Sequence, residues 1–150
     1  MTLTMRIKPG REYLAILVDG VFDLDYANEL TPRILDACAL HRSSRLIVDA
    51  RGVRGTILLG ERYIYAETFA RLYKERRVAG TVRHVQFAFV AVPPVLDPQR
   101  FGEKVAVSRG VQVKVFHAIE EACAWLEGRS PKPADTSPVL LLSRRSPLQD

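Results

Sequence analysis

Residues 101–126, FGEKVAVSRGVQVKVFHAIEEACAWL, decide the fold class of this chain. Their pattern predicts a short helix that stops at Gly110, a buried strand over 111–116 and a final helix that stops before Gly128. One side of that final helix is an ordinary apolar stripe: Ile119, Ala122, Cys123 and Leu126. A helix, a strand and a helix in this order are typical of a sheet with crossover helices, so the sequence predicts an α/β fold.

The first residues predict an antiparallel hairpin at the start of the sheet. Residues 3–8 alternate apolar and polar side chains, and residues 13–18, YLAILV, form a second apolar run. The Pro-Gly-Arg sequence at 9–11 supplies a turn between them. An Asp-Gly pair at 19–20 breaks the second run, and we expect that strand to continue at 21–22 beyond a bulge.

After the hairpin, helices and strands alternate. Helical spacing of apolar residues predicts helices over 25–41 and 58–77, and apolar runs predict strands over 45–50 and 82–92. The run over 82–92 is the longest strand candidate, and we expect it at the centre of the sheet. The predicted architecture is therefore a mixed β-sheet that opens with an antiparallel hairpin and continues with right-handed βα crossover units.

Capping residues mark several helix ends. Gly80 is expected to end the long helix, and Asp97 to cap a helix whose first residue is Pro98. Pro32 leaves two alternatives open: it kinks the helix over 25–41, or it begins that helix with Thr31 as the cap.

Composition bounds the class of protein. The chain has 150 residues, of which 47% are apolar and 26% charged, as in one ordinary globular domain. No apolar run approaches the ~20 residues of a membrane span, and the start, MTLTMRIKPG, lacks the apolar core of a signal peptide. We therefore expect a cytoplasmic protein.

The charge pattern argues against nucleic acid as a partner. The net charge is +5, and arginines supply 17 of the 22 basic residues. They are scattered along the chain and do not interleave with aromatic residues, so the pattern indicates solvated surface arginine.

The last part of the chain differs in composition. Residues 129–150 hold four of the nine prolines and show no helical period. We predict one folded domain over 1–128 and a flexible Pro-rich tail over 129–150. The apolar run at 139–142 could dock on a sheet edge or on a neighbouring chain.

No matched set of reactive groups emerges from the sequence. Residues 15–25, AILVDGVFDLD, are superficially similar to the DxDG motif of haloacid-dehalogenase-type phosphatases, but Leu17 stands at the nucleophile position. The histidines have no Ser or Cys partner placed by spacing, and two isolated cysteines do not make a zinc site. The three histidines are His41, His84 and His117. We predict a non-enzymatic protein without a cofactor or metal.

The loop over 49–56, DARGVRGT, is a candidate binding site. It follows the carboxyl end of a predicted parallel strand, where α/β sheets usually hold their functional groups. Arg51, Arg54 and Thr56 would offer contacts to an anion or a partner, although the spacing matches no phosphate-binding motif. The alternative is a structural loop whose arginines stay in water. If a site exists, we expect residues 19–22, 49–56 and 93–97 to converge there.

Aromatic residues crowd the long predicted helix. Tyr65, Phe69 and Leu72 lie beside its main apolar stripe, so the apolar face is broader than one sheet contact requires. This leaves room for another subunit, a lipid or a small hydrophobic ligand. We predict Tyr63, Tyr65, Phe69 and Leu72 as residues of an apolar ligand site or an interface.

Four segments carry a resemblance to a known family. They are LDYANELTPRILDA, RLIVDARGVRG, ERYIYAETFA and AVSRGVQVKVFHAIEEACAWL, within residues 3–127. Together they resemble the STAS family, the domain shared by sulfate transporters and anti-sigma-factor antagonists. The SpoIIAA-like branch, which consists of small stand-alone bacterial proteins, is the most similar.

The resemblance implies a sheet with its helices mainly on one face and a binding or regulatory role without catalysis. In anti-sigma antagonists, a serine in the loop after the third strand is phosphorylated. Here that position falls near Leu58 or Leu59, and the only nearby hydroxyl is that of Thr56, so the usual charge switch is missing.

Two functions follow as hypotheses. The first is a regulatory module that engages a protein partner or forms a homodimer. The second, which the SpoIIAA-like branch also implies, is a carrier or sensor of a lipid-like or other small apolar ligand, with peripheral association to a membrane surface.

Overall fold

The computed structural model describes residues 3–128, so the predicted tail over 129–150 lies outside the described residues. The five strands of its sheet are β1 Thr4–Pro9, β2 Leu14–Val21, β3 Arg45–Arg54, β4 Gln86–Val90 and β5 Gln112–Phe116. The helices are α1 Leu24–His41, α2 Leu59–Ala79, α3 Phe101–Ser108 and α4 Ile119–Leu126.

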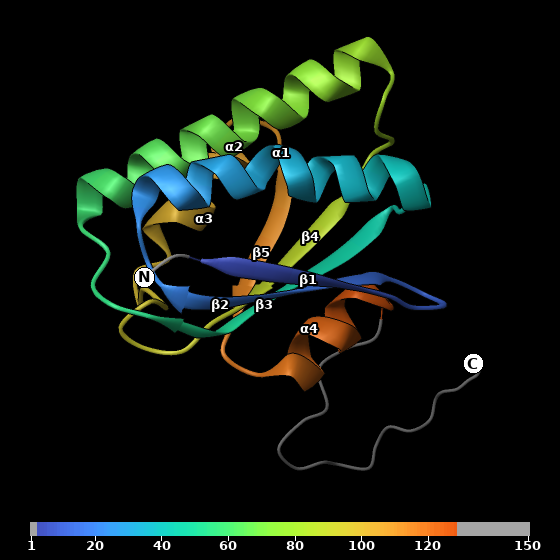
Figure 1. The fold of residues 1–150 in the computed structure, drawn as a ribbon. Helices are drawn as coiled ribbons and strands as arrows, with labels where there is room; N and C mark the ends of the chain where they lie inside the picture. Colours follow the sequence, from blue (N-terminus) through green and yellow to red (C-terminus); the bar gives the residue numbers. More distant parts are fainter. Residues whose placement is uncertain (1–2, 129–150) are drawn as a thin grey trace.

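The strands lie in the sheet in the order in which they occur in the sequence. β1 pairs antiparallel with β2, and the pairs from β2 to β5 are parallel. α1, α2 and α3 cover one face and α4 covers the other (Figure 1). The predicted mixed sheet with an opening hairpin is confirmed.

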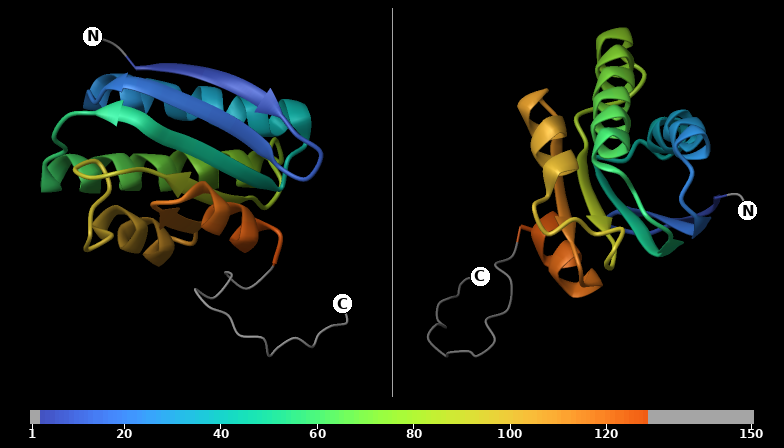
Figure 2. Two further views of the ribbon diagram at one scale, coloured as in Figure 1. Left: turned by 90° about the horizontal axis from the view of Figure 1, so that it is seen from below. Right: turned by 90° about the vertical axis from the view of Figure 1, so that its left-hand side faces the viewer.

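The two faces have separate cores because side chains alternate along each strand. Phe87 of β4 points to the face covered by three helices, whereas Ala88 and Val90 point to α4. α4 completes the smaller core with Ala122 and Leu126. Figure 2 shows the two layers of helices on opposite sides of the sheet.

The centre of the sheet differs from the prediction. β4 is five residues long, whereas the ten-residue β3 is the middle strand, so the expectation for 82–92 was wrong. β3 runs through the predicted loop because β2 continues beside it after a register shift between Leu17 and Asp19. A side chain at Gly52 would overlap the Asp19 carboxylate, so this glycine lets the two strands approach.

The two helix starts considered from the sequence have different outcomes. Asp23 caps α1 by accepting a hydrogen bond from Tyr26 N–H, and Pro32 lies inside the helix, so the alternative in which the helix begins at Pro32 was wrong. Asp97 accepts the N–H of Phe101 at 2.9 Å, as a cap should, but a turn separates Pro98 from the helix. Gly80 ends α2 in a left-handed conformation, as expected.

Both cysteines are free thiols. Cys38 is buried in α1, and burial raises its pKa to about 12, so it remains a neutral, apolar side chain. None of the helices within residues 3–128 is long and apolar enough to cross a membrane.

Candidate functional site

A cavity of about 190 Å³ lies between the sheet and the three helices that cover it. Its walls are mostly apolar and come from every layer of that side of the molecule. α1 contributes Ala27, Leu30 and Ile34, and the sheet contributes Val18, Val48 and Phe89. A concave, largely apolar cavity with a few polar groups is the usual form of a small-molecule site.

One end of this cavity is formed by the loops that leave the carboxyl ends of the parallel strands. Phe22 follows β2, Ile57 follows β3, and Val95 and Asp97 follow β4. The three segments that the sequence analysis expected to converge, 19–22, 49–56 and 93–97, therefore each supply a wall residue or its immediate neighbour.

The polar groups of the wall come from the start of α2 and from residues 97–103. Arg62 of α2 donates hydrogen bonds to the carbonyl oxygens of Val95 at 2.8 Å and Pro94 at 3.0 Å. The N–H groups of Phe101 and Gln99, together with the charge of Arg62, hold the pKa of Asp97 below its ordinary value. This end of the cavity is therefore charged at neutral pH. We call Arg62, Asp97, Arg100 and Glu103 the charged end.

Two members of the charged end bind the backbone of the same residue, Val115 of the outer strand β5. The Glu103 carboxylate accepts the N–H of Val115 at 2.8 Å, and the Arg100 guanidinium donates to the carbonyl of Val115. Side chains of α3 thus satisfy a backbone group that no further strand pairs with. These bonds fix α3 beside β5 and hold one wall of the cavity in place.

Tyr65 supplies a hydroxyl within the apolar wall. Burial raises the pKa of Tyr65 to about 12, and a hydrogen bond with Thr31 opposes part of this shift. The phenol is therefore neutral at physiological pH. Among the described residues, Tyr65 is the only one on the cavity wall whose side chain carries a hydroxyl group.

Among solved structures, the chain is similar to an anti-sigma factor antagonist from Mycobacterium paratuberculosis. The two share 15% identity and a TM-score of 0.55, over 84% of this chain and 95% of that chain. The chain has a STAS-like fold. It is also similar to an uncharacterised protein with a SpoIIAA-like fold from Shewanella loihica, with 18% identity and a TM-score of 0.48, over 83% and 94% of the two chains. No protein-family model matches the sequence, and no curated protein is similar to it.

The four residues predicted for an apolar site in this STAS-like fold do not all lie at the cavity. Tyr65 and Phe69 both lie on the cavity wall. Leu72 packs against the large core without reaching the cavity. Phe69 is 3% exposed, so it contacts the cavity and the core rather than an outer surface.

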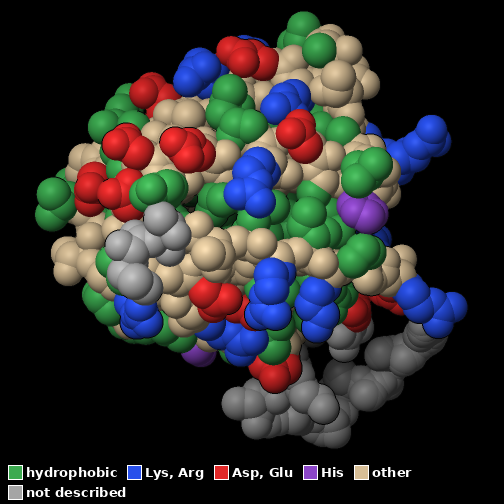
Figure 3. Space-filling view, in the orientation of Figure 1, with side chains coloured by type: hydrophobic (Ala, Val, Ile, Leu, Met, Phe, Trp, Pro, Cys, Tyr) green, Lys and Arg blue, Asp and Glu red, His purple; other side chains and the backbone are tan. Residues whose placement is uncertain are grey.

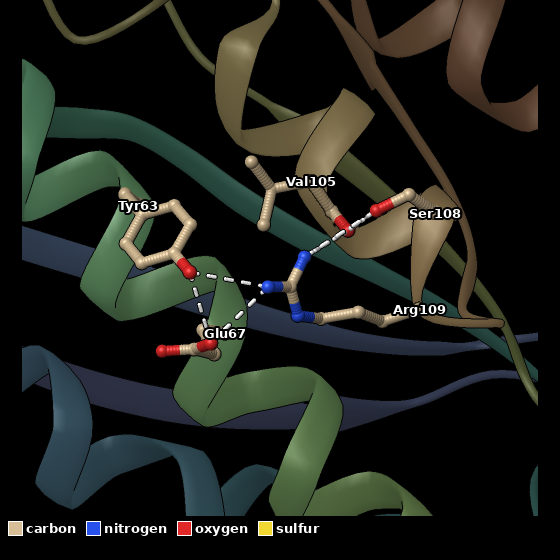
Figure 4. A network of polar contacts seen from close by, with 5 residues as sticks. All are labelled: Tyr63, Glu67, Val105, Ser108 and Arg109. Carbon is tan, nitrogen blue, oxygen red and sulfur yellow. Dashed lines mark hydrogen bonds and ion pairs between the residues drawn. The ribbon is translucent and has the colours of Figure 1, made fainter.

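Tyr63 is not part of the cavity wall, and its hydroxyl points towards Arg109 at the end of α3 (Figure 4). Its hydroxyl donates to Glu67 at 3.1 Å and accepts from Arg109 at 3.1 Å. Arg109 also contacts Glu67 at 3.1 Å, so the three side chains connect α2 to α3. Tyr63 therefore has a structural role between helices, whatever else it binds.

The predicted anion or partner residues are not brought together. Arg51 binds Asp49 through one edge of its guanidinium group, with Nε and Nη2 donating to the two carboxylate oxygens at 2.9 and 2.8 Å, on the face of the sheet opposite the cavity. Arg54 is the last residue of β3, and Thr56 lies in the loop between β3 and α2. Both side chains are exposed. A role for the Thr56 hydroxyl stays a prediction.

No constellation for metal binding is found within residues 3–128. His41, His84 and His117 are all exposed. On the face seen in Figure 3, acidic and basic side chains are interspersed over the helices rather than gathered into one patch.

Of the charged end, sequence reasoning placed Asp97 within an expected site segment, 93–97, and missed Arg62, Arg100 and Glu103. Arg62 precedes Ala66 and Phe69 by four and seven residues, which is the spacing of one helix side, so its inward position was open to prediction. Arg100 and Glu103 meet Val115 only through the packing of α3 on β5, and no local pattern indicates that contact.

Proposed function

We propose that this chain is a non-catalytic binding module with a STAS-like fold, and that it takes a small apolar molecule into the cavity beneath α1, α2 and α3. The observation that carries the proposal is the cavity itself, with a mostly apolar wall and a charged end. Protein interiors are otherwise close-packed, and voids larger than a water molecule are few and costly. A cavity of about 190 Å³ is therefore a feature that binding explains and packing does not.

The arrangement suits a ligand that is apolar along most of its surface. Burial of apolar surface contributes roughly 25 cal/mol per Å² to binding. Away from the charged end, the described wall residues are mostly apolar, so this burial would supply most of the affinity there. Phe22, Phe69 and Phe89 supply large apolar contacts. A regulatory role, in which the ligand changes how the module binds other molecules, is the part of the proposal that the shared fold with an anti-sigma factor antagonist supports.

The experiment is a titration of the full chain with naphthalene and, separately, with palmitate, followed by amide chemical shifts in the NMR spectrum. We expect saturable shifts at Phe69 and Phe89 with at least one of the two. The variant Ala66→Leu puts a larger side chain into the wall and should weaken that binding by about tenfold or more. Ala79→Leu, the same change at an exposed position of α2, should leave it unchanged.

Two results would contradict the proposal. If neither compound shifts these amides, or if both variants bind as well as the unchanged chain, the cavity is not a ligand site. Thermal unfolding of each variant checks that it is folded before its binding is compared.

A second candidate is engagement of a protein partner, with a second copy of the chain as the form most easily tested. Exposed apolar side chains at the beginning of α2 favour it: Leu58 is 63%, Leu59 64% and Ile64 45% exposed. Exposed apolar groups that lie together are typical of interaction surfaces. We expect sedimentation to detect a dimer that Leu59→Asp dissociates and that Leu40→Asp, at an exposed position on α1, does not. A monomer at all concentrations would contradict self-association.

A further inference from the structure

The size of the cavity and the chemistry of its charged end narrow the class of ligand. We propose that the cavity binds a compact molecule of one or two rings that carries a single carboxylate, with the rings against the aromatic wall and the carboxylate at Arg62 and Arg100. This inference rests on the proposed function and goes further, because it selects one class among the apolar ligands.

The volume of the cavity limits the size of the apolar part of the ligand. An engineered apolar cavity of about 150 Å³ in another protein binds benzene. The present cavity, about 190 Å³, is somewhat larger and is open on one side. It therefore accommodates one ring or two fused rings, whereas most of a long acyl chain would stay outside.

The wall is rigid where the rings would lie. Phe69 meets Phe87 edge to face with ring centres 4.9 Å apart, and meets Phe89 in the same way at 5.9 Å. Tyr65 adds a tilted contact with Phe69 at 6.1 Å. Aromatic side chains fixed by one another present a surface of constant shape, which suits a flat, rigid molecule better than a flexible chain.

The charged end favours an anion over a cation. Within residues 3–128, neither Arg62 nor Arg100 forms an ion pair with a carboxylate. Their side chains donate to the carbonyl oxygens of Pro94, Val95 and Val115. A guanidinium has five N–H donors, so donors remain for a ligand. Lys104 adds a third positive charge close enough to lower the pKa of Asp97.

The two carboxylates of this end are already bonded to donors. Asp97 accepts the N–H groups of Phe101 and Gln99, and Glu103 accepts that of Val115. Three positive charges thus stand against two negative ones, and an incoming carboxylate brings the count to balance. A cationic ligand would add a fourth positive charge.

The test compares four compounds by calorimetry on the full chain near neutral pH: 1-naphthoate, naphthalene, 1-naphthylmethylammonium and palmitate. We expect 1-naphthoate to bind at least about tenfold more tightly than each of the others, since a hydrogen bond to a charged group is worth roughly 1.5–3 kcal/mol. Arg62→Met, which keeps the apolar stem, should remove that advantage, so that this variant binds 1-naphthoate no more tightly than it binds naphthalene. Arg62→Lys should restore part of it.

Arg71→Met is the matched control, because Arg71 lies on the same helix and pairs only with Glu75 among the described residues. It should bind 1-naphthoate as the unchanged chain does. Tighter binding of palmitate would overturn the compact class, and tighter binding of the ammonium compound would overturn the choice of an anion; both would leave the proposed function standing. Binding of none of the four would overturn the proposed function as well.

Discussion

The guanidinium of Arg109 lies over the ring of Tyr63, 5.5 Å from its centre, and donates a hydrogen bond to the hydroxyl of the same residue. Arg109 follows the last residue of α3, and Tyr63 lies in the second turn of α2. Glu67 completes the contact with an ion pair to Arg109 at 3.1 Å. These side chains thus join α2 and α3, two of the three helices that cover the cavity (Figure 4).

Arg109→Ala should lower the free energy of unfolding by about 1 kcal/mol, because it removes a stacked cation and a partly exposed ion pair together. Arg109→Lys keeps the charge but not the planar group and should lose about half as much. Urea unfolding measures both. Arg71→Ala, which breaks an exposed pair at 3.5 Å on α2, is the control and should cost less than about 0.5 kcal/mol. Equal losses for Arg109→Ala and Arg71→Ala would contradict a joint role for these side chains.

Tyr73→Phe should destabilise the fold although it removes a single oxygen atom. The buried hydroxyl of Tyr73 accepts the N–H of Val85 at 2.9 Å, and Val85 is completely buried. The substitution leaves that N–H without its partner, at a cost of roughly 1–3 kcal/mol. Thermal or urea unfolding measures the loss, and Tyr26→Phe, on an exposed ring, should change stability far less. A neutral Tyr73→Phe would mean that Val85 finds another acceptor.

Glu103→Ala should release the outer strand locally. It removes the acceptor of the Val115 N–H, so this amide should exchange with deuterium at least about tenfold faster, in line with roughly 1.5–3 kcal/mol for a bond to a charged group. Glu103→Gln keeps a carbonyl oxygen and should retain most of the protection. Amides of β3, which is paired on both sides, provide the internal reference. Unchanged exchange at Val115 in Glu103→Ala would refute the role given to this carboxylate.

Arg51→Gln should raise the pKa of Asp49. The hydrogen bond from the Arg51 side chain is the largest cause of the lowered pKa of this carboxyl in the folded chain. A lowered folded-state pKa stabilises the fold above the unfolded-state pKa of roughly 4, and the stabilisation is lost as the pH falls through the folded-state value. Carboxyl chemical shifts followed by NMR between about pH 2 and 6 measure the pKa, and Asp49→Asn should flatten the acid part of the stability profile.

Arg54→Gln is the control for that titration, because the described residues give Arg54 no ion pair. It should leave the pKa of Asp49 where it is. A pKa of Asp49 that rises equally in both variants would show that general positive charge, rather than the bond from Arg51, lowers it.

The sequence predicted elements wherever a local pattern decides them. Gly80 ends α2 because glycine adopts the left-handed conformation of a helix end at little cost, and this can be read from the chain alone. β3 was predicted too short because Gly52 also looks like a loop residue. In the structure it is a strand residue that makes room for Asp19 of the neighbouring strand, and such a contact between distant segments leaves no local signal.

In the candidate site too, residues were predicted where a local pattern indicates them and missed where tertiary packing decides their position. Tyr65 and Phe69 were predicted because an apolar face wider than a helix needs is visible in helical spacing, and both lie on the cavity wall. The pairing of Arg51 with Asp49 was missed, although the two residues lie on one face of a strand, because the strand was expected to end at residue 50, between them. Arg100 depends on the position of α3 relative to β5, which only the folded chain defines.

The backbone of Val115, whose N–H is bound by Glu103 and whose carbonyl is bound by Arg100, also affects what this edge of the sheet offers to other proteins. An outer strand with free N–H and C=O groups is a template for intermolecular β-pairing and fibril growth. Here part of that template is already occupied from within the molecule. At the opposite margin β1 carries Arg6 and Lys8 and ends at Pro9, which lacks an N–H to donate. Both margins therefore discourage aggregation through added strands, by ionic side chains on one side and by charge and proline on the other.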